Sequence, residues 1–368
     1  MSVTIGDITD VIERFAPPAL QEDYDNSGLI IGDRHTPCSG VLAAFDVTPT
    51  IVDEAVATGC NLIVAHHPLI FRGLRRLNGS NAVERTVIAA VRAGVAVYAA
   101  HTSADNVRGG VSWRMASMLG LKDVEVLDAA EGKVEKLVTY VPSGSLEIVR
   151  EALFAAGAGH IGNYDSCSFH TSGTGTFRAL DGARPYAGAP GEFHREKEER
   201  LEVILPAWRH RAVERALTKA HPYEEPAYDF YAVRSGADRQ AGAGVVGNLA
   251  EPVTVGRFVS LVKEAFGCRT VRCSDYPADR RIARVALCGG SGAFLAGKAM
   301  AAGAQAFVTA DVKYHDFADA ADEIFLVDAG HFETEHCITS LFREIITDFF
   351  PNFAVRCATT LRNPVNYM

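Results

Sequence analysis

Two blocks of this sequence alternate short apolar runs with helix-forming segments, and this alternation restricts the chain to an α/β fold. In the first block, the predicted strands are 41–47, 62–65 and 95–100, and the predicted helices are 50–59, 81–93 and 107–119. In the second block, the predicted strands are 285–289, 306–310 and 324–329, and the predicted helices are 292–302, 316–322 and 333–349. Strands that alternate with helices across short turns are typical of a parallel sheet covered by helices. We therefore predict a core of two similar α/β halves with mainly parallel sheets.

The two blocks place similar polar residues after corresponding strands. When the elements are aligned, AHHP (65–68) stands opposite TADVKYHD (309–316), and HTSAD (101–105) stands opposite GHFETE (330–335). This correspondence indicates an internal repeat of the architecture. The sequence identity between the blocks is low, so two independent α/β units remain an alternative.

The segment between the blocks has a different pattern. It contains a predicted strand, helix, two strands, a helix and a final strand, at 133–141, 145–156, 167–180, 199–205, 207–220 and 228–234. This βαββαβ order is the signature of a ferredoxin-like domain. The Gly-Ala-rich segment 235–244 indicates the return to the core. We therefore predict a first core half over 1–131, an inserted domain over 132–239 and a second core half over 240–368.

Composition narrows the class of protein. A chain of 368 residues with 48% apolar and 22% charged residues is typical of a globular protein with two or three domains. The formal net charge of -9 argues against a nucleic-acid partner. The N-terminus lacks the features of a secretory signal, and no apolar run approaches the roughly 20 residues of a membrane span, so we expect no membrane partner. The eight cysteines form no CxxC pair, which favours reduced thiols and a cytoplasmic location.

Histidines and carboxylates follow the predicted strands. His66 and His67 come directly after strand 62–65, and Pro68 favours the exit of the chain from the sheet there. Asp105 follows strand 95–100, while His331 and Glu335 lie four residues apart, on one face, at the start of the last helix. Ligands bind at the carboxyl ends of strands in open α/β sheets. Solvated loop histidines, and Asp105 as the cap of the helix predicted from residue 107, are the alternatives.

The residue types indicate which metals would fit. Three imidazoles and two carboxylates without a thiolate suit Zn, Fe, Mn or Co better than Ca or Mg, and carboxylates can bridge two cations. A pair of metal ions about 3.5–4 Å apart can activate water and polarise a substrate.

Five motifs resemble those of the Nif3-like family. They are DNSGLIIGD (25–33), HHPLIF (66–71), HTSADNVRGG (101–110), TADVKYHD (309–316) and DAGHFETEH (328–336). The chain is similar to the long bacterial form of this family, whose members carry the name GTP cyclohydrolase 1 type 2 homologue, and residues 132–239 resemble its CutA/PII-like insertion. The resemblance implies a toroidal homohexamer and two divalent metal ions per subunit, bound by His66, His67, Asp105, His331 and Glu335. One difference is Ser103, where the family usually has Asn.

Other residues in these motifs have open roles. His101, Asp311 and His315 could act in acid–base chemistry or bind substrate, or they could orient the ligand imidazoles. The glycines at 109–110 and 289–292 could present N–H groups to a phosphate, although tight packing is the alternative. The segment DYDNSG (23–28) reads as a polar turn that could line the site.

Two functions remain in view. The resemblance implies a metal-dependent hydrolase of a nucleotide or related heterocycle, acting on the carbon–nitrogen bonds of a cyclic amidine as the name GTP cyclohydrolase suggests. No cluster of Arg and Lys that would obviously hold a triphosphate is evident in the sequence at the site. The alternative is a non-catalytic or regulatory metal-binding hexamer whose insertion senses a small ligand.

Overall fold

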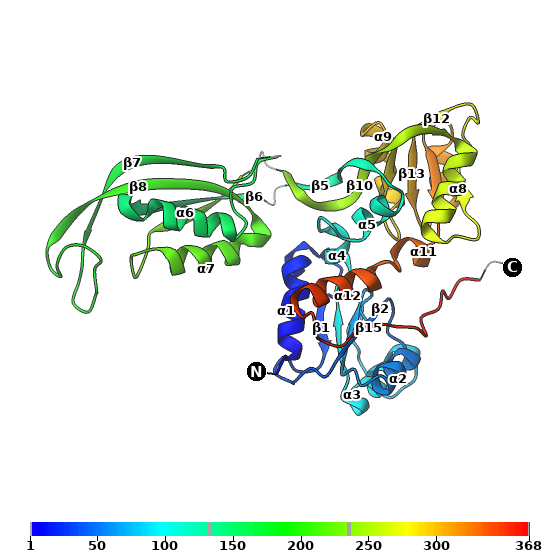
Figure 1. The fold of residues 1–368 in the computed structure, drawn as a ribbon, viewed down its shortest axis with the longest axis horizontal. Coiled ribbons are helices and arrows are strands. Elements are labelled where there is room, and N and C mark those ends of the chain that lie inside the picture. The colour runs from blue at the N-terminus through cyan, green and yellow to red at the C-terminus, as the bar shows by residue number, and fades with distance from the viewer. Residues whose placement is uncertain (1, 132–133, 163, 234–236, 367) are drawn as a thin grey trace. The chain divides into compact units, whose positions relative to one another are not determined.

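The chain divides into two compact units. The computed structural model describes residues 2–131, 134–162, 164–233, 237–366 and 368 (Figure 1). Met1–Ala129 and Gln240–Met368 form one unit, here called the core unit, and Ala130–Arg239 form the other, the inserted unit. The predicted boundary at residue 132 and the first two residues of the Gly-Ala-rich segment, 235–236, lie outside the described residues. No helix of the described part is long and apolar enough to cross a membrane.

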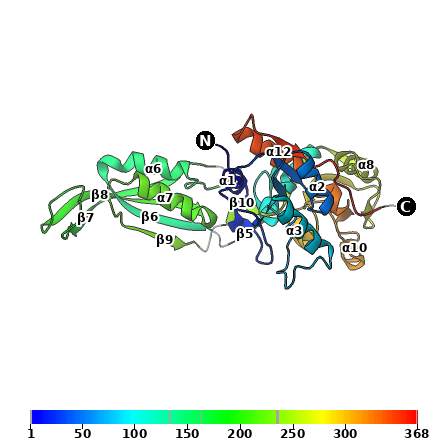
Figure 2. The same cartoon turned by 90° about the horizontal axis from the view of Figure 1, so that it is seen from below.

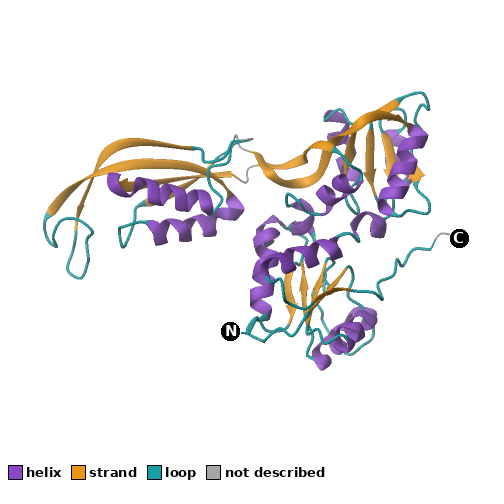
Figure 3. Cartoon of the chain, viewed as in Figure 1, coloured by secondary structure: helices purple, strands orange, loops and turns teal. Residues whose placement is uncertain are grey.

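The first sheet of the core unit has the strand order β1-β4-β3-β2-β15. The strands are β1 (Gly28–Ile31), β2 (Val41–Ala44), β3 (Leu62–Ala65), β4 (Ala96–Ala99) and β15 (Val355–Cys357). Helices α1 (Ile5–Phe15), α2 (Pro49–Ala57) and α3 (Ala82–Ala93) belong to the same half. Strands β15, β2, β3 and β4 are parallel, and β1 is antiparallel to β4. Every residue of β2, β3 and β4 is buried, as expected of strands that are covered on both faces (Figure 3).

The second sheet has the order β11-β14-β13-β12-β10-β5. Its strands are β5 (Lys122–Glu131), β10 (Ala237–Thr254), β11 (Arg272–Cys273), β12 (Arg281–Leu287), β13 (Ala306–Thr309) and β14 (Phe325–Asp328). The helices of this half are α8 (Val255–Phe266), α9 (Ala296–Ala301) and α10 (Tyr314–Ala320). The central strands β12, β13 and β14 are parallel, whereas β11 and β10 flank them in antiparallel pairs. The predicted α/β class is confirmed, and this sheet is mixed rather than mainly parallel.

The two halves share one topology. In each half, a helix and an edge strand precede three parallel strands that are joined through helices. The last of the three parallel strands pairs antiparallel with this edge strand. The strand order is therefore β1-β4-β3-β2 in one sheet and β11-β14-β13-β12 in the other. The repeat that the aligned motifs indicated is therefore present in the strand order.

Two predicted helices differ from the observed ones. The helix predicted over 107–119 begins at Val111 in α5 (Val111–Met118), and Asp105 lies in a separate short helix, α4 (Thr102–Asn106). The interruption occurs at Gly109, whose φ of +85° a helix cannot accommodate. The helix predicted over 333–349 divides into α11 (His331–Glu335) and α12 (Ile338–Phe349).

The Gly-Ala-rich segment near the second boundary belongs to strand β10 where the structure describes it. A Cβ at Gly242 would lie 2.1 Å from the carbonyl oxygen of Asp128, and a Cβ at Gly247 would lie 3.0 Å from that of Lys122. Glycine is needed there because β5 approaches closely. The same contacts show that β5 and β10 run in opposite directions.

The C-terminal segment joins the two sheets. After β14 of the second sheet, helix α12 packs against α1, β2 and β15, all of which belong to the first sheet or its cover. Helix α11 therefore lies where the chain passes from one sheet to the other (Figure 1).

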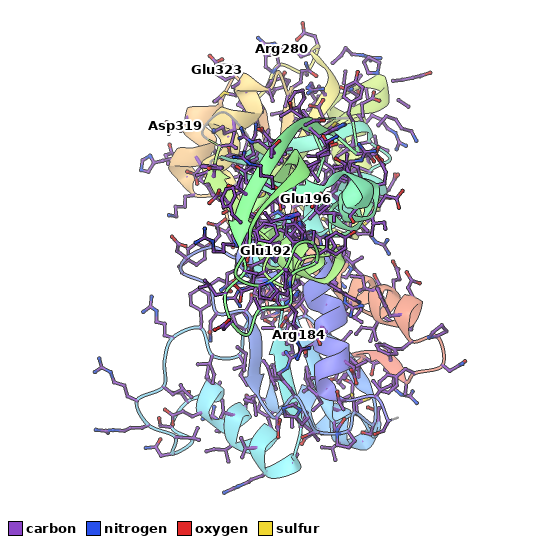
Figure 4. All side chains as sticks on the ribbon, turned by 90° about the vertical axis from the view of Figure 1, so that its left-hand side faces the viewer. Arg184, Glu192, Glu196, Arg280, Asp319 and Glu323 are labelled. Carbon is purple, nitrogen blue, oxygen red and sulfur yellow. The ribbon has the colours of Figure 1, made fainter. Side chains whose placement is uncertain are left out.

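The inserted unit is an antiparallel sheet covered by two helices. Its elements are β6 (Val134–Pro142), α6 (Leu146–Ala155), β7 (Ser168–Arg178), β8 (Phe193–Pro206), α7 (His210–Ala220) and β9 (Tyr228–Ala232). This is the predicted βαββαβ order, with the strands arranged β7-β8-β6-β9. Helices α6 and α7 lie on the same face of the sheet (Figure 2), and their apolar residues Val149, Leu153, Val213 and Leu217 are fully buried. The loop between β7 and β8 carries Arg184, which is labelled in Figure 4. The backbone N–H of Arg184 donates to Glu224 Oε1 at 2.8 Å.

We predict that the core unit folds without the insertion. Because β5 and β10 are antiparallel neighbours, replacing 132–239 with a two-residue Asn-Gly turn should close them into a hairpin. The shortened chain should remain soluble and bind the same amount of metal as the full chain, measured by gel filtration, circular dichroism and elemental analysis. Insoluble products with linkers of every length from two to eight residues would contradict this prediction.

Candidate metal centre

The carboxyl ends of three parallel strands meet at one edge of the first sheet. Strand β2 is followed by Asp46, β3 by His66 and His67, and β4 by His101. Helix α4, which comes directly after His101, carries Asp105. Helix α11 brings His331 and Glu335 to the same place from the other half of the chain.

Glu335 lies among the three histidines predicted as ligands. Its Oε2 atom is 2.9 Å from His331 Nε2, 3.4 Å from His67 Nε2 and 3.6 Å from His66 Nε2. His66 Nε2 is also 3.6 Å from Asp105 Oδ1. The structure therefore brings all five predicted ligand residues together, although they come from three separate segments of the chain.

Two groups within this cluster could each hold a metal ion. One consists of His66, Asp105 and Glu335, and the other of His67, His331 and Glu335. A third group of the same kind joins His66 and His67 to His101. The first two groups share only the carboxylate of Glu335.

Four atoms of the cluster are buried without a hydrogen-bond partner in the described part of the chain. They are His66 Nε2, Asp105 Oδ1, His331 Nε2 and Glu335 Oε2. A buried polar atom that lacks a partner costs about 1–3 kcal/mol. A cation coordinated by these nitrogen and oxygen atoms would remove that cost, so this donor set fits a metal ion.

Each ligand imidazole is held from its other side. The Nδ1 atom of His67 lies 2.8 Å from Asp46 Oδ1, and that of His331 lies 2.6 Å from Asp311 Oδ2. His66 Nδ1 lies 3.1 Å from the carbonyl oxygen of Ala100. With these oxygens accepting from Nδ1–H, each ring presents Nε2 to the cluster. Asp46 was missed in the sequence because it fell inside the predicted strand 41–47, whereas β2 ends at Ala44 and leaves Asp46 beyond the sheet.

His101 is held by a buried carboxylate that the sequence did not reveal as functional. Asp25, from the polar turn before β1, places Oδ1 2.9 Å from His101 Nδ1, and its side chain has no exposed surface. The backbone N–H of Thr102 also donates to Asp25, at 3.0 Å. The His101 ring lies 5.3 Å, centroid to centroid, from the rings of both His66 and His67. The turn DYDNSG therefore fixes an imidazole beside the ligand histidines.

Asp311 and His315 have different surroundings. Asp311 contacts His331, which is the orienting contact that the sequence left open, and its backbone adopts a φ of +54°. His315 is exposed on α10 and lies against Tyr314. Within the described residues, no contact joins His315 to the cluster.

A glycine turn after β12 packs against Glu335. A Cβ at Gly290 would lie 2.2 Å from Glu335 Oε1, and the φ of Gly290 is +57°. Gly289 is also close, since its Cβ would lie 3.2 Å from Glu335 Cγ. These glycines serve the tight packing that was one of the two alternatives for this motif.

Burial and neighbouring charges shift the pKa values within the cluster. Burial acts to raise the pKa of Glu335, but the imidazoles of His331, His66 and His67 hold it well below its usual value. Burial raises the pKa of Asp105 to about 6. Burial opposes the charged form of His67, yet Asp46 and Glu335 raise its pKa to about 10, and Glu335 and Asp311 similarly raise that of His331 to about 9.

Comparisons with known proteins show which family the chain resembles. Residues 3–364 match the family model of Duf34/NIF3 (NGG1p interacting factor 3). A protein of Halalkalibacterium halodurans called GTP cyclohydrolase 1 type 2 homolog is 40% identical over 326 residues, which cover 88% of this chain and 87% of the relative. A protein of the same name from Mycobacterium bovis is 37% identical over 100% of this chain and 97% of its own length. The crystal structure of a Bacillus cereus protein related to NIF3 superposes with a TM-score of 0.85 at 35% identity, covering 100% of both chains.

We predict that metal binding releases protons. In the metal-free protein at pH 7.5, both ring nitrogens of His67 and of His331 carry a proton, because the pKa values of these side chains are raised to about 10 and about 9. A metal ion binds only the neutral ring, so loading should release roughly two protons per chain. Metal affinity should accordingly rise as the pH increases to about 9. Titration calorimetry in buffers of different ionisation enthalpy measures this release, and heats that are independent of the buffer would contradict it.

We also predict that Gly290→Ala disrupts the centre. The new methyl group would collide with the Glu335 carboxylate, and the backbone would be strained at positive φ. The variant should fold, as judged by circular dichroism, but lose most of its bound metal in elemental analysis. Gly297→Ala is the matched control, since its Cβ would meet nothing within 4 Å. Equal metal content in both variants would show that Gly290 does not position Glu335.

Proposed function

The chain belongs to the Duf34/NIF3 family, and we propose that it is a hydrolase that depends on two divalent metal ions per subunit. The observation that carries this proposal is the position of Glu335 between two groups of donors. His66 and Asp105 would hold one ion, His67 and His331 the other, and the carboxylate of Glu335 would bridge them. Zn, Fe, Mn and Co each suit this mixture of imidazole and carboxylate ligands. When bound, such a pair of ions supplies an activated water molecule and polarises the substrate.

The residues around the ions have separate tasks in this proposal. Asp46, Asp311 and the carbonyl of Ala100 keep the ligand rings in the orientation that presents Nε2 to the cluster. His101 donates Nδ1–H to Asp25, so its Nε2 keeps a free lone pair beside His66 and His67. His101 is therefore the residue best placed to take up a proton during hydrolysis.

The substrate is proposed to be a nucleotide or a related heterocycle. The name of the relatives, GTP cyclohydrolase 1 type 2 homolog, supports a reaction in which a carbon–nitrogen bond of a cyclic amidine is hydrolysed. Fold and family alone do not fix a substrate. The nucleotide therefore serves here as the first compound to test.

The proposed assembly is a toroidal homohexamer. The family resemblance supports it, and closed rings arise when head-to-tail interfaces complete a rotation. Light scattering should give a mass near six times the 39.5 kDa of one chain. A stable monomer or dimer at micromolar concentration would contradict the ring.

A regulatory assembly is the second candidate function, and a cavity in the inserted unit favours it. The cavity has a volume of about 1020 Å³, which is large enough for a small ligand. Its lining includes Tyr140, Tyr186, Tyr223, Arg200 and Glu198. A folded, metal-loaded protein that is inert towards a broad panel of nucleotides and cyclic amides would favour this function over hydrolysis.

We predict that metal-loaded protein hydrolyses a member of that panel and that Glu335→Gln abolishes the reaction. The substitution removes the charge that both donor groups share, so the loss should be at least a hundredfold. Glu323→Gln is the control, because Glu323 is exposed (Figure 4) and makes no contact with the cluster in the described residues. Product formation followed by chromatography distinguishes the variants. Full activity of Glu335→Gln would exclude the proposed centre as the catalytic site.

A further inference from the structure

We propose that two exposed aromatic residues beside the candidate metal centre, together with three arginines of the loop that begins after Phe71, form a recognition site for a planar heterocycle that carries phosphate. The residues are Tyr24, Phe71, Arg72, Arg75 and Arg76. This inference rests on the proposed hydrolase function and extends it by naming the residues that would select the substrate.

The two aromatic residues border the metal centre. The Phe71 ring lies 6.3 Å, centroid to centroid, from the His101 ring and 6.3 Å from the Tyr24 ring. The segments that carry them are tied together, because Asn26 Nδ2 donates to the carbonyl oxygen of Ile70 at 2.6 Å. A compound that stacks on Phe71 would therefore lie next to His101 and its neighbours His66 and His67.

The rings present free surface at this position. Tyr24 is 65% exposed and Phe71 is 46% exposed. The pKa of the Tyr24 hydroxyl is raised, first by partial burial and then by the carboxylates of Glu22, Asp25 and Asp105, so Tyr24 lies within the field of the cluster. Exposed π faces bind planar bases by stacking, and each stacked base gains about 1–3 kcal/mol.

The three arginines bring positive charge to the same loop. All three are exposed, and none forms an ion pair with another described residue. The loop that carries them has no helix or strand between Ala65 at the end of β3 and Ala82 at the start of α3. In a chain of net charge -9, three unpaired guanidinium groups within five residues make a local anion-binding surface. Guanidinium groups bind phosphate through paired, charge-assisted hydrogen bonds.

This arrangement supplies the phosphate-binding cluster that was not evident in the sequence. The motif HHPLIF ends at Phe71, and the arginines begin at the next residue. The ring of a bound nucleotide would lie on the aromatic residues, close to the cluster, while its phosphates would reach the arginines. An isolated phosphate or an uncharged base would use only half of the site.

The test compares the binding of two probes to full-length, metal-loaded protein. GTP carries both the heterocycle and the phosphates, whereas guanosine carries only the heterocycle. The triple variant Arg72→Gln, Arg75→Gln, Arg76→Gln should bind GTP about tenfold more weakly or worse and guanosine equally well. Phe71→Leu should weaken both probes by roughly tenfold. Equal metal content in all variants verifies that the centre is intact.

A matched triple variant controls for the change in net charge. Arg211→Gln, Arg215→Gln and Arg269→Gln removes the same charge from exposed positions elsewhere and should leave GTP binding unchanged. The inference is overturned if both triple variants weaken GTP equally, if the first binds GTP like the wild type, or if the wild type binds neither probe. It is also overturned if the loop arginines affect single-stranded RNA binding and not GTP.

Measuring both binding and hydrolysis on the same variants tests the recognition site separately from the proposed hydrolase function. Binding does not require turnover, so the affinities test the recognition site alone. Binding with the expected dependence but without hydrolysis would remove the hydrolase function and keep the recognition site. Hydrolysis that is insensitive to Phe71 and to the three arginines would keep the hydrolase and remove the site.

Discussion

The carboxylate of Glu335 is the group on which the arrangement of the core unit depends. It is buried among three imidazoles at 2.9 to 3.6 Å, and its Oε2 atom has no hydrogen-bond partner among the described residues. A buried carboxylate without a partner is costly. Glu335 comes from α11, in the second half of the chain, whereas His66 and His67 follow β3 of the first half. Helix α12 and strand β15 come after α11 and pack onto the first sheet, so the cluster lies where the chain crosses between the two sheets.

The repeat in topology gives the two halves different parts of one site. In the first half, the chain leaves β3 through His66 and His67, which face the cluster. At the equivalent exit of β13 in the second half, Ala310 is followed by Asp311, which turns at a φ of +54° and accepts from His331. The first half therefore places two predicted ligands where the second half places a carboxylate that orients a predicted ligand. Equivalent strand ends of the two halves can carry different functional side chains, because the carboxyl ends of parallel strands lie at the same edge of a sheet.

The sequence was sufficient for the fold class and for bringing the five predicted ligands to one location. Apolar strands such as Leu62–Ala65 are recognisable because both of their faces are buried. Elements whose ends depend on contacts between residues distant in sequence were harder to predict. The Gly-Ala-rich segment at 235–244 indicated the return to the core but not the strand β10 that it enters, in which Gly242 passes close to Asp128. The roles of Asp25 and Asp46 were hidden for the same reason, since their histidine partners are 76 and 21 residues away.

The distribution of charge around the site separates binding from chemistry. The cluster itself is a set of carboxylates and imidazoles that could hold metal ions. Positive charge lies on the exposed loop of Arg72, Arg75 and Arg76, and the ring of Phe71, the residue before Arg72, lies 6.3 Å from the rings of Tyr24 and His101. A substrate with a planar ring and an anionic group could contact both the aromatic residues and the arginines. Because Phe71 follows His67 by four residues, the predicted metal ligands and the proposed recognition residues belong to one continuous segment.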